Sequence, residues 1–88
     1  RTRAGAEIDL IVDRGSERIG FEFKSGVSVS RHDASGLIAG IADGIIRSGR
    51  ILYAGSRRYA LTDAIEVIPA GEWLLSSVPP AHETGNGR

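Results

Sequence analysis

The 88 residues make one small domain at most, and a domain of this size buries about 60% of the surface of its unfolded chain. Ten arginines and one lysine balance eleven acidic residues, so the net charge is zero. The chain therefore lacks the overall positive charge that is typical of nucleic-acid-binding domains. The absence of cysteine excludes disulfides and thiolate zinc sites, and no apolar run is long enough to span a membrane. We expect a soluble, cytoplasmic α/β domain with a modest core.

Two segments near the amino end, 7–12 and 19–24, alternate apolar and polar residues, which predicts two β-strands. Gly15-Ser16 suits a two-residue hairpin turn, so facing residues should have numbers that sum to thirty-one. One face of this hairpin should carry the apolar side chains of Ile8, Leu10, Val12, Ile19, Phe21 and Phe23. The opposite face should carry Glu7, Asp9, Gly20, Glu22 and Lys24.

This register places Asp9 opposite Glu22 and Glu7 opposite Lys24. Directly opposed side chains have Cβ atoms roughly 4.5–5.5 Å apart, where two like charges destabilise a hairpin. A divalent cation such as Mg²⁺ favours such a pair, because carboxylates and water are its usual ligands. The alternative is an ordinary polar hairpin face on which Lys24 forms an ion pair with Glu7.

A helix is predicted over 31–47. Ser30 to Asp33 resembles a capping box that begins it, and Ser48-Gly49 resembles a C-terminal cap that ends it. One row of this helix consists of Gly36, Gly40 and Gly44. Each glycine costs about 0.8–1.0 kcal/mol relative to alanine, so we expect close packing to compensate. We favour packing on the sheet, and a helix–helix interface is the alternative.

The remaining chain predicts short strands at 50–54, 59–61 and 64–68, the last ended by Pro69. One helical turn at 71–75 should close the core with Trp73, and a flexible tail should follow from Ser76. Four arginines lie near the expected helix start and strand ends, where solvated turn residues and a phosphate-contacting patch are the two interpretations. They are Arg31, Arg50, Arg57 and Arg58.

Asp9, twelve further residues and then Glu22-Phe23-Lys24, all on a hairpin, resemble the PD-(D/E)XK nuclease signature, with Ile8 in place of its proline. A longer series of segments resembles domain of unknown function 4143 over residues 1–75: 1–9, 21–25, 51–53, 68–69 and 73–74. That family forms the carboxy-terminal domain of many bacterial and archaeal AAA-type ATPases and is assigned to the same nuclease-like superfamily.

The resemblance implies a restriction-endonuclease-like core over 1–75, with its first helix missing from this fragment of a larger protein, and a flexible tail over 76–88. It implies that Asp9 and Glu22, with the carbonyl of Phe23, hold Mg²⁺ or Mn²⁺, and that Lys24 orients the attacking water. Glu7 is either a further neighbour of the metal or the ion-pair partner of Lys24.

The same resemblance implies an ATPase domain in the same protein as the partner, with ATP bound only there, because this chain has no phosphate-binding Gly-Lys-Ser/Thr loop. A nuclease would act on DNA or RNA. Two alternatives remain open: a catalytically silent module that positions the ATPase on a partner protein or DNA, and a homo-oligomer formed through the Gly36, Gly40 and Gly44 row.

Overall fold

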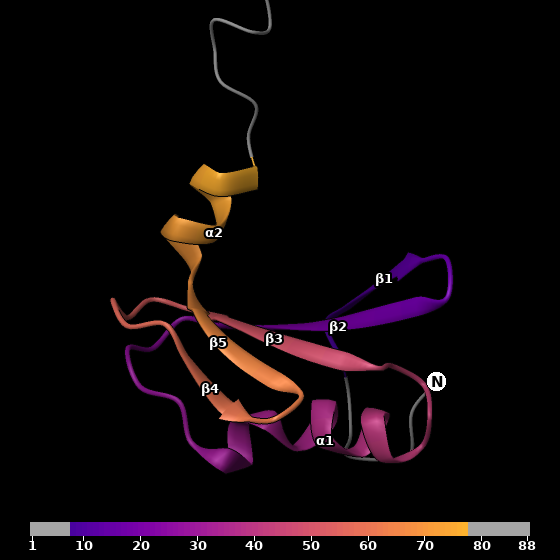
Figure 1. The fold of residues 1–88 in the computed structure, drawn as a ribbon. Coiled ribbons are helices and arrows are strands. Elements are labelled where there is room, and N and C mark those ends of the chain that lie inside the picture. The colour runs from indigo at the N-terminus through magenta and orange to yellow at the C-terminus, as the bar shows by residue number, and fades with distance from the viewer. Residues whose placement is uncertain (1–7, 78–88) are drawn as a thin grey trace, which may run out of the picture.

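A five-stranded mixed β-sheet forms the centre of the computed structural model, which describes residues 8–77 (Figure 1). The strand order is β1-β2-β3-β5-β4. The elements in chain order are β1 (Leu10–Arg14), β2 (Glu17–Lys24), the 3-10 helix η1 (Arg31–Ala34), α1 (Ser35–Ala42), β3 (Ser48–Tyr53), β4 (Tyr59–Thr62), β5 (Ile65–Pro69) and α2 (Ala70–Ser77). The α/β class is therefore confirmed. Between residues 8 and 77 no helix is long and apolar enough to cross a membrane.

The predicted hairpin register is confirmed. Strands β1 and β2 are antiparallel, and their paired residues run from Leu10 opposite Phe21 to Arg14 opposite Glu17. Gly15 has a φ of 70°, the left-handed conformation that a tight hairpin turn requires. The first strand begins only at Leu10, so Asp9 lies just before the paired segment.

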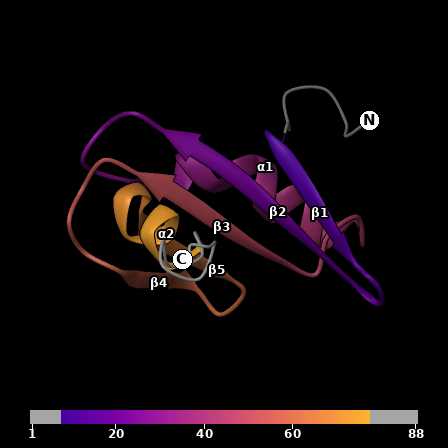
Figure 2. The same ribbon diagram turned by 90° about the horizontal axis from the view of Figure 1, so that it is seen from above.

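Strands β2, β3 and β5 are parallel, and antiparallel strands flank them at both edges of the sheet. The segment between β2 and β3 contains η1 and α1, because parallel neighbours need a long crossover connection. Seen from above, α2 lies over β3 and β5, whereas α1 lies beneath the sheet (Figure 2). The two short strands predicted after β3 are confirmed as β4 and β5, and β5 ends at Pro69 as expected.

The predicted end of the main helix was wrong. It ends at Ala42, and Gly44 adopts a φ of 77°. The amide of Ile45 donates to the carbonyl of Gly40 at 2.8 Å, and that of Gly44 donates to Ile41 at 3.1 Å. This pair of bonds is the Schellman motif, which satisfies carbonyls at a helix end. The glycine that ends the helix is therefore Gly44, and Ser48-Gly49 instead begins β3.

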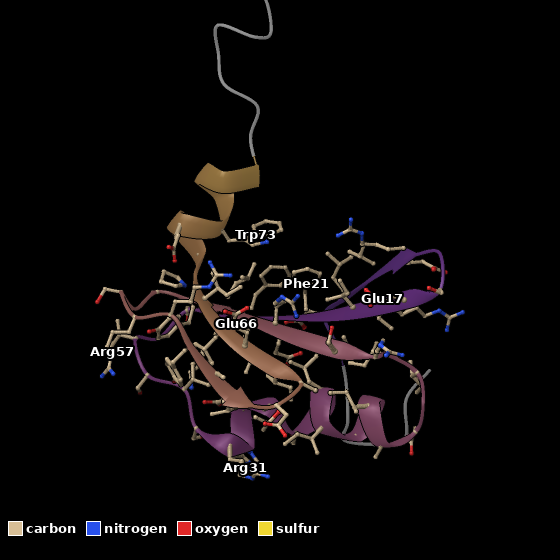
Figure 3. All side chains as sticks on the ribbon, viewed as in Figure 1. Glu17, Phe21, Arg31, Arg57, Glu66 and Trp73 are labelled. Carbon is tan, nitrogen blue, oxygen red and sulfur yellow. The ribbon has the colours of Figure 1, made fainter. Side chains whose placement is uncertain are left out.

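Each face of the sheet has its own apolar cluster. Beneath the sheet, side chains of η1, α1, the segment after α1 and the strands form the cluster of Ala34, Leu37, Ile46, Ile51, Tyr53, Ile65 and Val67. Above it, Trp73 of α2 packs on the cluster of Ile19, Phe21, Leu52 and Ile68. The rings of Trp73 and Phe21 meet edge to face at a centroid distance of 5.8 Å (Figure 3). The role predicted for Trp73 is confirmed, although α2 is eight residues long rather than one turn.

The glycine row packs within the chain. Gly36 and Gly40 are buried, and a Cβ atom on Gly40 would lie 2.8 Å from the Cδ1 of Ile8. This contact corrects the predicted position of Ile8, which lies on the α1 side because the chain bends at Asp9 before β1 begins. Gly40 therefore packs inside the domain against Ile8 and Ile46, which precede and follow the helix, and not directly on a strand as the preferred alternative had it. Gly44, the third glycine of the row, is exposed, so an interface between helices of two copies stays a prediction.

Candidate functional site

The end of β2 carries two of the predicted site residues on one face. Glu22 and Lys24 are two residues apart on the strand, so both side chains are on the α1 side of the sheet. They line a cavity of about 280 Å³ to which η1 contributes Asp33. The remaining lining residues are Phe23, Ser25 and Ile51. The alternation of β2 predicted that Glu22 and Lys24 share a face, but it did not predict Asp33.

Lys24 forms an ion pair with Asp33, and both side chains are largely shielded, with 31% and 24% of their surface exposed. The same carboxylate oxygen accepts the backbone N–H of Ser30 at 2.8 Å and its hydroxyl at 3.2 Å. The hydrogen bond from Lys24, followed by that from the Ser30 backbone, lowers the pKa of Asp33 to about 2 against an opposing effect of burial. Asp33 therefore joins the end of β2 to the start of η1.

The predicted partner of Lys24, Glu7, lies outside the described residues. The structure gives Lys24 a partner that the strand pattern did not predict. A signal existed, because the capping box that begins at Ser30 places an acidic residue only nine positions after Lys24. The strand pattern could not show that the chain turns back beneath the sheet and brings Asp33 to the end of β2.

Asp9 contacts the backbone between the other two signature residues. One carboxylate oxygen of Asp9 accepts the N–H of Phe23 at 2.9 Å, in keeping with the predicted position of Asp9 across from Glu22. The Phe23 side chain is 54% exposed on the opposite face of the sheet. Glu22 is half-buried rather than on an open polar surface, and its Oε1 atom is shielded from solvent.

The positions of these residues determine which ligands a cation could have at this end of the hairpin. Over residues 8–77, no three or more histidine, aspartate and glutamate side chains gather closely enough to hold a metal. A cation at this end of the hairpin would therefore rely on Asp9, Glu22, the Phe23 carbonyl and water. Mg²⁺ commonly accepts one or two carboxylates together with several waters, so this donor set fits that ion.

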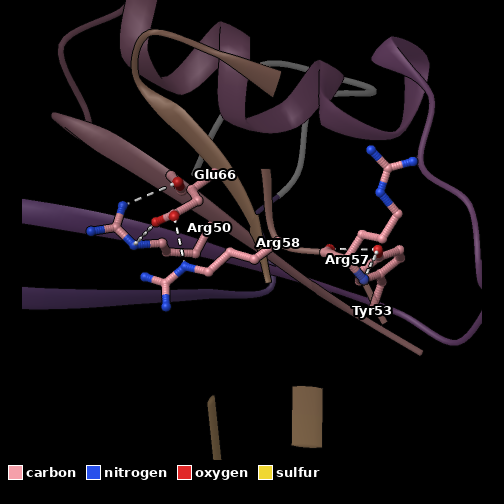
Figure 4. Close-up of polar contacts among 6 residues, drawn as sticks. Arg50, Tyr53, Arg57, Arg58 and Glu66 are labelled. Atoms are coloured by element: carbon pink, nitrogen blue, oxygen red, sulfur yellow. Dashed lines mark hydrogen bonds and ion pairs between the residues drawn. The ribbon is translucent and has the colours of Figure 1, made fainter. Parts of the chain in front are cut away.

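Two of the candidate phosphate-binding arginines have a structural partner instead. Arg58 Nε donates to Glu66 at 2.8 Å, and Arg50 Nε lies 3.9 Å from the other oxygen of the same carboxylate (Figure 4). The hydrogen bond from Arg58 lowers the pKa of Glu66 and raises that of Arg58 itself. Arg57, directly beside Arg58 in sequence, does not take part in this cluster.

Comparison with known proteins identifies the family. The sequence profile described as "Domain of unknown function (DUF4143)" matches residues 1–73. The chain is 36% identical over 78 residues to the uncharacterized proteins Mb2031c of Mycobacterium bovis and Rv2008c of Mycobacterium tuberculosis. These alignments cover 86% of this chain but only 17% of each relative, and no solved structure gives a significant match. The chain therefore belongs to the DUF4143 family.

Proposed function

We propose that this chain is an accessory domain of a larger cytoplasmic AAA-type ATP-binding protein. In this proposal the domain positions the ATPase on a partner and does not hydrolyse phosphodiester bonds, and the ATP is bound by the ATPase domain. Support comes from the family resemblance and from the length of the relatives, of which this chain spans 17%. The observation that carries the proposal is the ion pair between Lys24 and Asp33.

In a nuclease of this signature, the lysine must approach the attacking water or the phosphate. Here the ammonium of Lys24 is held by a carboxylate that also bonds the backbone of Ser30. Moving Lys24 would therefore remove a partner from the residue that organises the start of η1. Charge-assisted hydrogen bonds are among the stronger ones in proteins, so this arrangement favours a structural role for Lys24.

The second candidate is a metal-dependent nuclease on a restriction-endonuclease-like core. The observation that favours it is the shared cavity of Glu22 and Lys24, together with the hydrogen bond that the Phe23 N–H, between them, donates to Asp9. Asp9, Glu22 and the Phe23 carbonyl would hold Mg²⁺ or Mn²⁺, which would supply Lewis acidity at a phosphate of DNA or RNA. Lys24 would have to leave Asp33 to orient the water.

Calorimetric titration with Mn²⁺ separates the two candidates. The variants are Asp9→Ala and Glu22→Ala, with Glu17→Ala as a control, because Glu17 is an exposed acidic residue at the far end of β2. The accessory-domain proposal predicts no saturable binding and no metal-dependent cleavage of labelled DNA or RNA. Saturable binding that both site variants abolish, with cleavage that Lys24→Met also abolishes, would establish the nuclease instead.

A further inference from the structure

A second cavity, of about 330 Å³, opens beside the carboxyl ends of the parallel strands β2 and β3. It is lined by Val27, Ser28, Val29, Tyr53, Arg57 and Tyr59. The loops that follow the two strands meet here, where the N–H of Ala54 donates to the carbonyl of Gly26 at 2.9 Å. In open α/β sheets, the carboxyl ends of parallel strands are the common position for ligands.

The lining combines an apolar wall with one cation. Two valines and two tyrosines supply apolar and aromatic surface, Ser28 supplies a hydroxyl, and no lining residue is acidic. Across residues 8–77, the guanidinium of Arg57 makes no ion pair or side-chain hydrogen bond, whereas that of Arg58 is bonded to Glu66. The one charge at this cavity is therefore positive and uncompensated within the described part of the chain.

Tyr53 holds the loop that carries Arg57 in place through two hydrogen bonds. The hydroxyl of Tyr53 donates to the Arg57 carbonyl at 2.6 Å and accepts the Arg57 N–H at 3.0 Å (Figure 4). Tyr53 is itself only 4% exposed, and a Cβ atom on Gly55 would overlap its ring. Both bonds involve the main chain of Arg57, so they fix its backbone beside the cavity and leave its side chain free to bind. A loop backbone that is already ordered lowers the entropic cost of binding.

We propose that this cavity binds a small oxyanion, a carboxylate or a phosphate, that is carried on an apolar ring. Arg57 would hold the anion, since a guanidinium matches the geometry of both groups. Val27, Val29 and Tyr59 would pack against the ring, and the volume lies at the lower end of the range for small-molecule sites. The proposal is independent of the acidic hairpin, because none of Asp9, Glu22 and Lys24 lines this cavity.

The test is a nitrogen–proton NMR titration of the chain with four small molecules. Phenyl phosphate and benzoate carry both features, inorganic phosphate carries only the anion, and benzyl alcohol carries only the ring. We expect phenyl phosphate or benzoate to bind at least tenfold more tightly than the other two, with shifts at Val27, Ser28 and Arg57. The tighter of the pair identifies the acid group. Equal affinity for phenyl phosphate and inorganic phosphate, shifts elsewhere, or no saturable shift would overturn the proposal.

Substitution of the cation supplies the second arm. Arg57→Ala keeps both bonds to Tyr53, because they involve only main-chain atoms, and we expect it to weaken binding about tenfold, as for loss of a charged hydrogen bond. Arg58→Ala is the matched control and should leave the affinity unchanged. Val27→Ser, at a side chain that is 72% exposed, should weaken binding without unfolding the chain. Equal effects of the two arginine variants, with spectra that show both folded, would refute the role of Arg57.

Discussion

Lys24 and Asp33 form the charged contact that joins the sheet to the segment beneath it. This contact depends on two side chains and on the Ser30 backbone, whose N–H orients the Asp33 carboxylate. The carboxylate must be ionised for the pair to exist. The contribution of Asp33 to folding should therefore depend on pH in a direction that its pKa determines.

The pKa of Asp33 is about 2 in the folded chain, below its ordinary value of 3.8. A lowered folded pKa means that the contribution is fully present above the ordinary value and is lost as the pH falls through about 2. Melting temperatures of the wild type and of Asp33→Asn should therefore differ most near pH 5 and converge towards pH 2.

The control is Asp63→Asn, because Asp63 is an exposed carboxylate in the turn between β4 and β5. It should show no comparable pH-dependent difference from the wild type. An Asp33→Asn difference that stays constant from pH 5 to pH 2 would show that the lost interaction is not the ionised pair.

Among the secondary-structure elements, a glycine just after α1 and a glycine within α2 should affect the stability of the fold in opposite ways. Gly44 adopts a positive φ at the end of α1, where the Schellman bonds satisfy the helix carbonyls. Gly71 lies within α2, has no positive φ, and would have no atom within 4 Å of an added Cβ. The same substitution should therefore change stability in opposite directions at the two positions.

Gly44→Ala should lower the free energy of unfolding by about 1–2 kcal/mol, because an L-residue pays a steric penalty in the left-handed region. Gly71→Ala should raise it by up to about 0.8–1.0 kcal/mol, the difference in helix propensity. Urea denaturation followed by circular dichroism measures both changes. A neutral Gly44→Ala would mean that the left-handed cap does not determine where α1 ends.

At the scale of the whole molecule, the two faces of the sheet are covered unequally. Beneath it, α1 and the segment after it bury Leu37 and Ile46 almost completely. Above it, α2 covers Phe21 through Trp73, but Leu10 and Phe23 remain 46% and 54% exposed. The stability of the upper cluster should therefore depend on α2 far more than on the hairpin end.

Trp73→Ala should lower the free energy of unfolding by about 2 kcal/mol, less than the 3–5 kcal/mol of a fully buried aromatic residue because Trp73 is only half-buried. Leu10→Ala, on the same face of the sheet, should cost less than about 1 kcal/mol, because the side chain already contacts water. Denaturant unfolding at one temperature compares the two. Equal losses would contradict the view that α2 is the main cover of this face.

Features that depend on short-range signals could be predicted from the amino-acid sequence. The hairpin register followed from the apolar alternation of residues 19–24 and the Gly15-Ser16 turn, and the start of η1 followed from the Ser30 to Asp33 capping box. The end of β5 followed from Pro69. Each of these depends on the conformational preferences of a few consecutive residues, which are much the same in any fold.

The contacts between distant residues, in contrast, became known only from the folded chain. The sequence predicted that the helix ends at Ser48-Gly49, but the chain ends it at Gly44 and returns Ile46 to the core. Lys24 pairs with Asp33, because the parallel crossover carries η1 beneath the end of β2. Arg58 pairs with Glu66, whereas Arg57 lines a cavity. Side-chain partners depend on how distant segments pack in space, which local propensities do not encode.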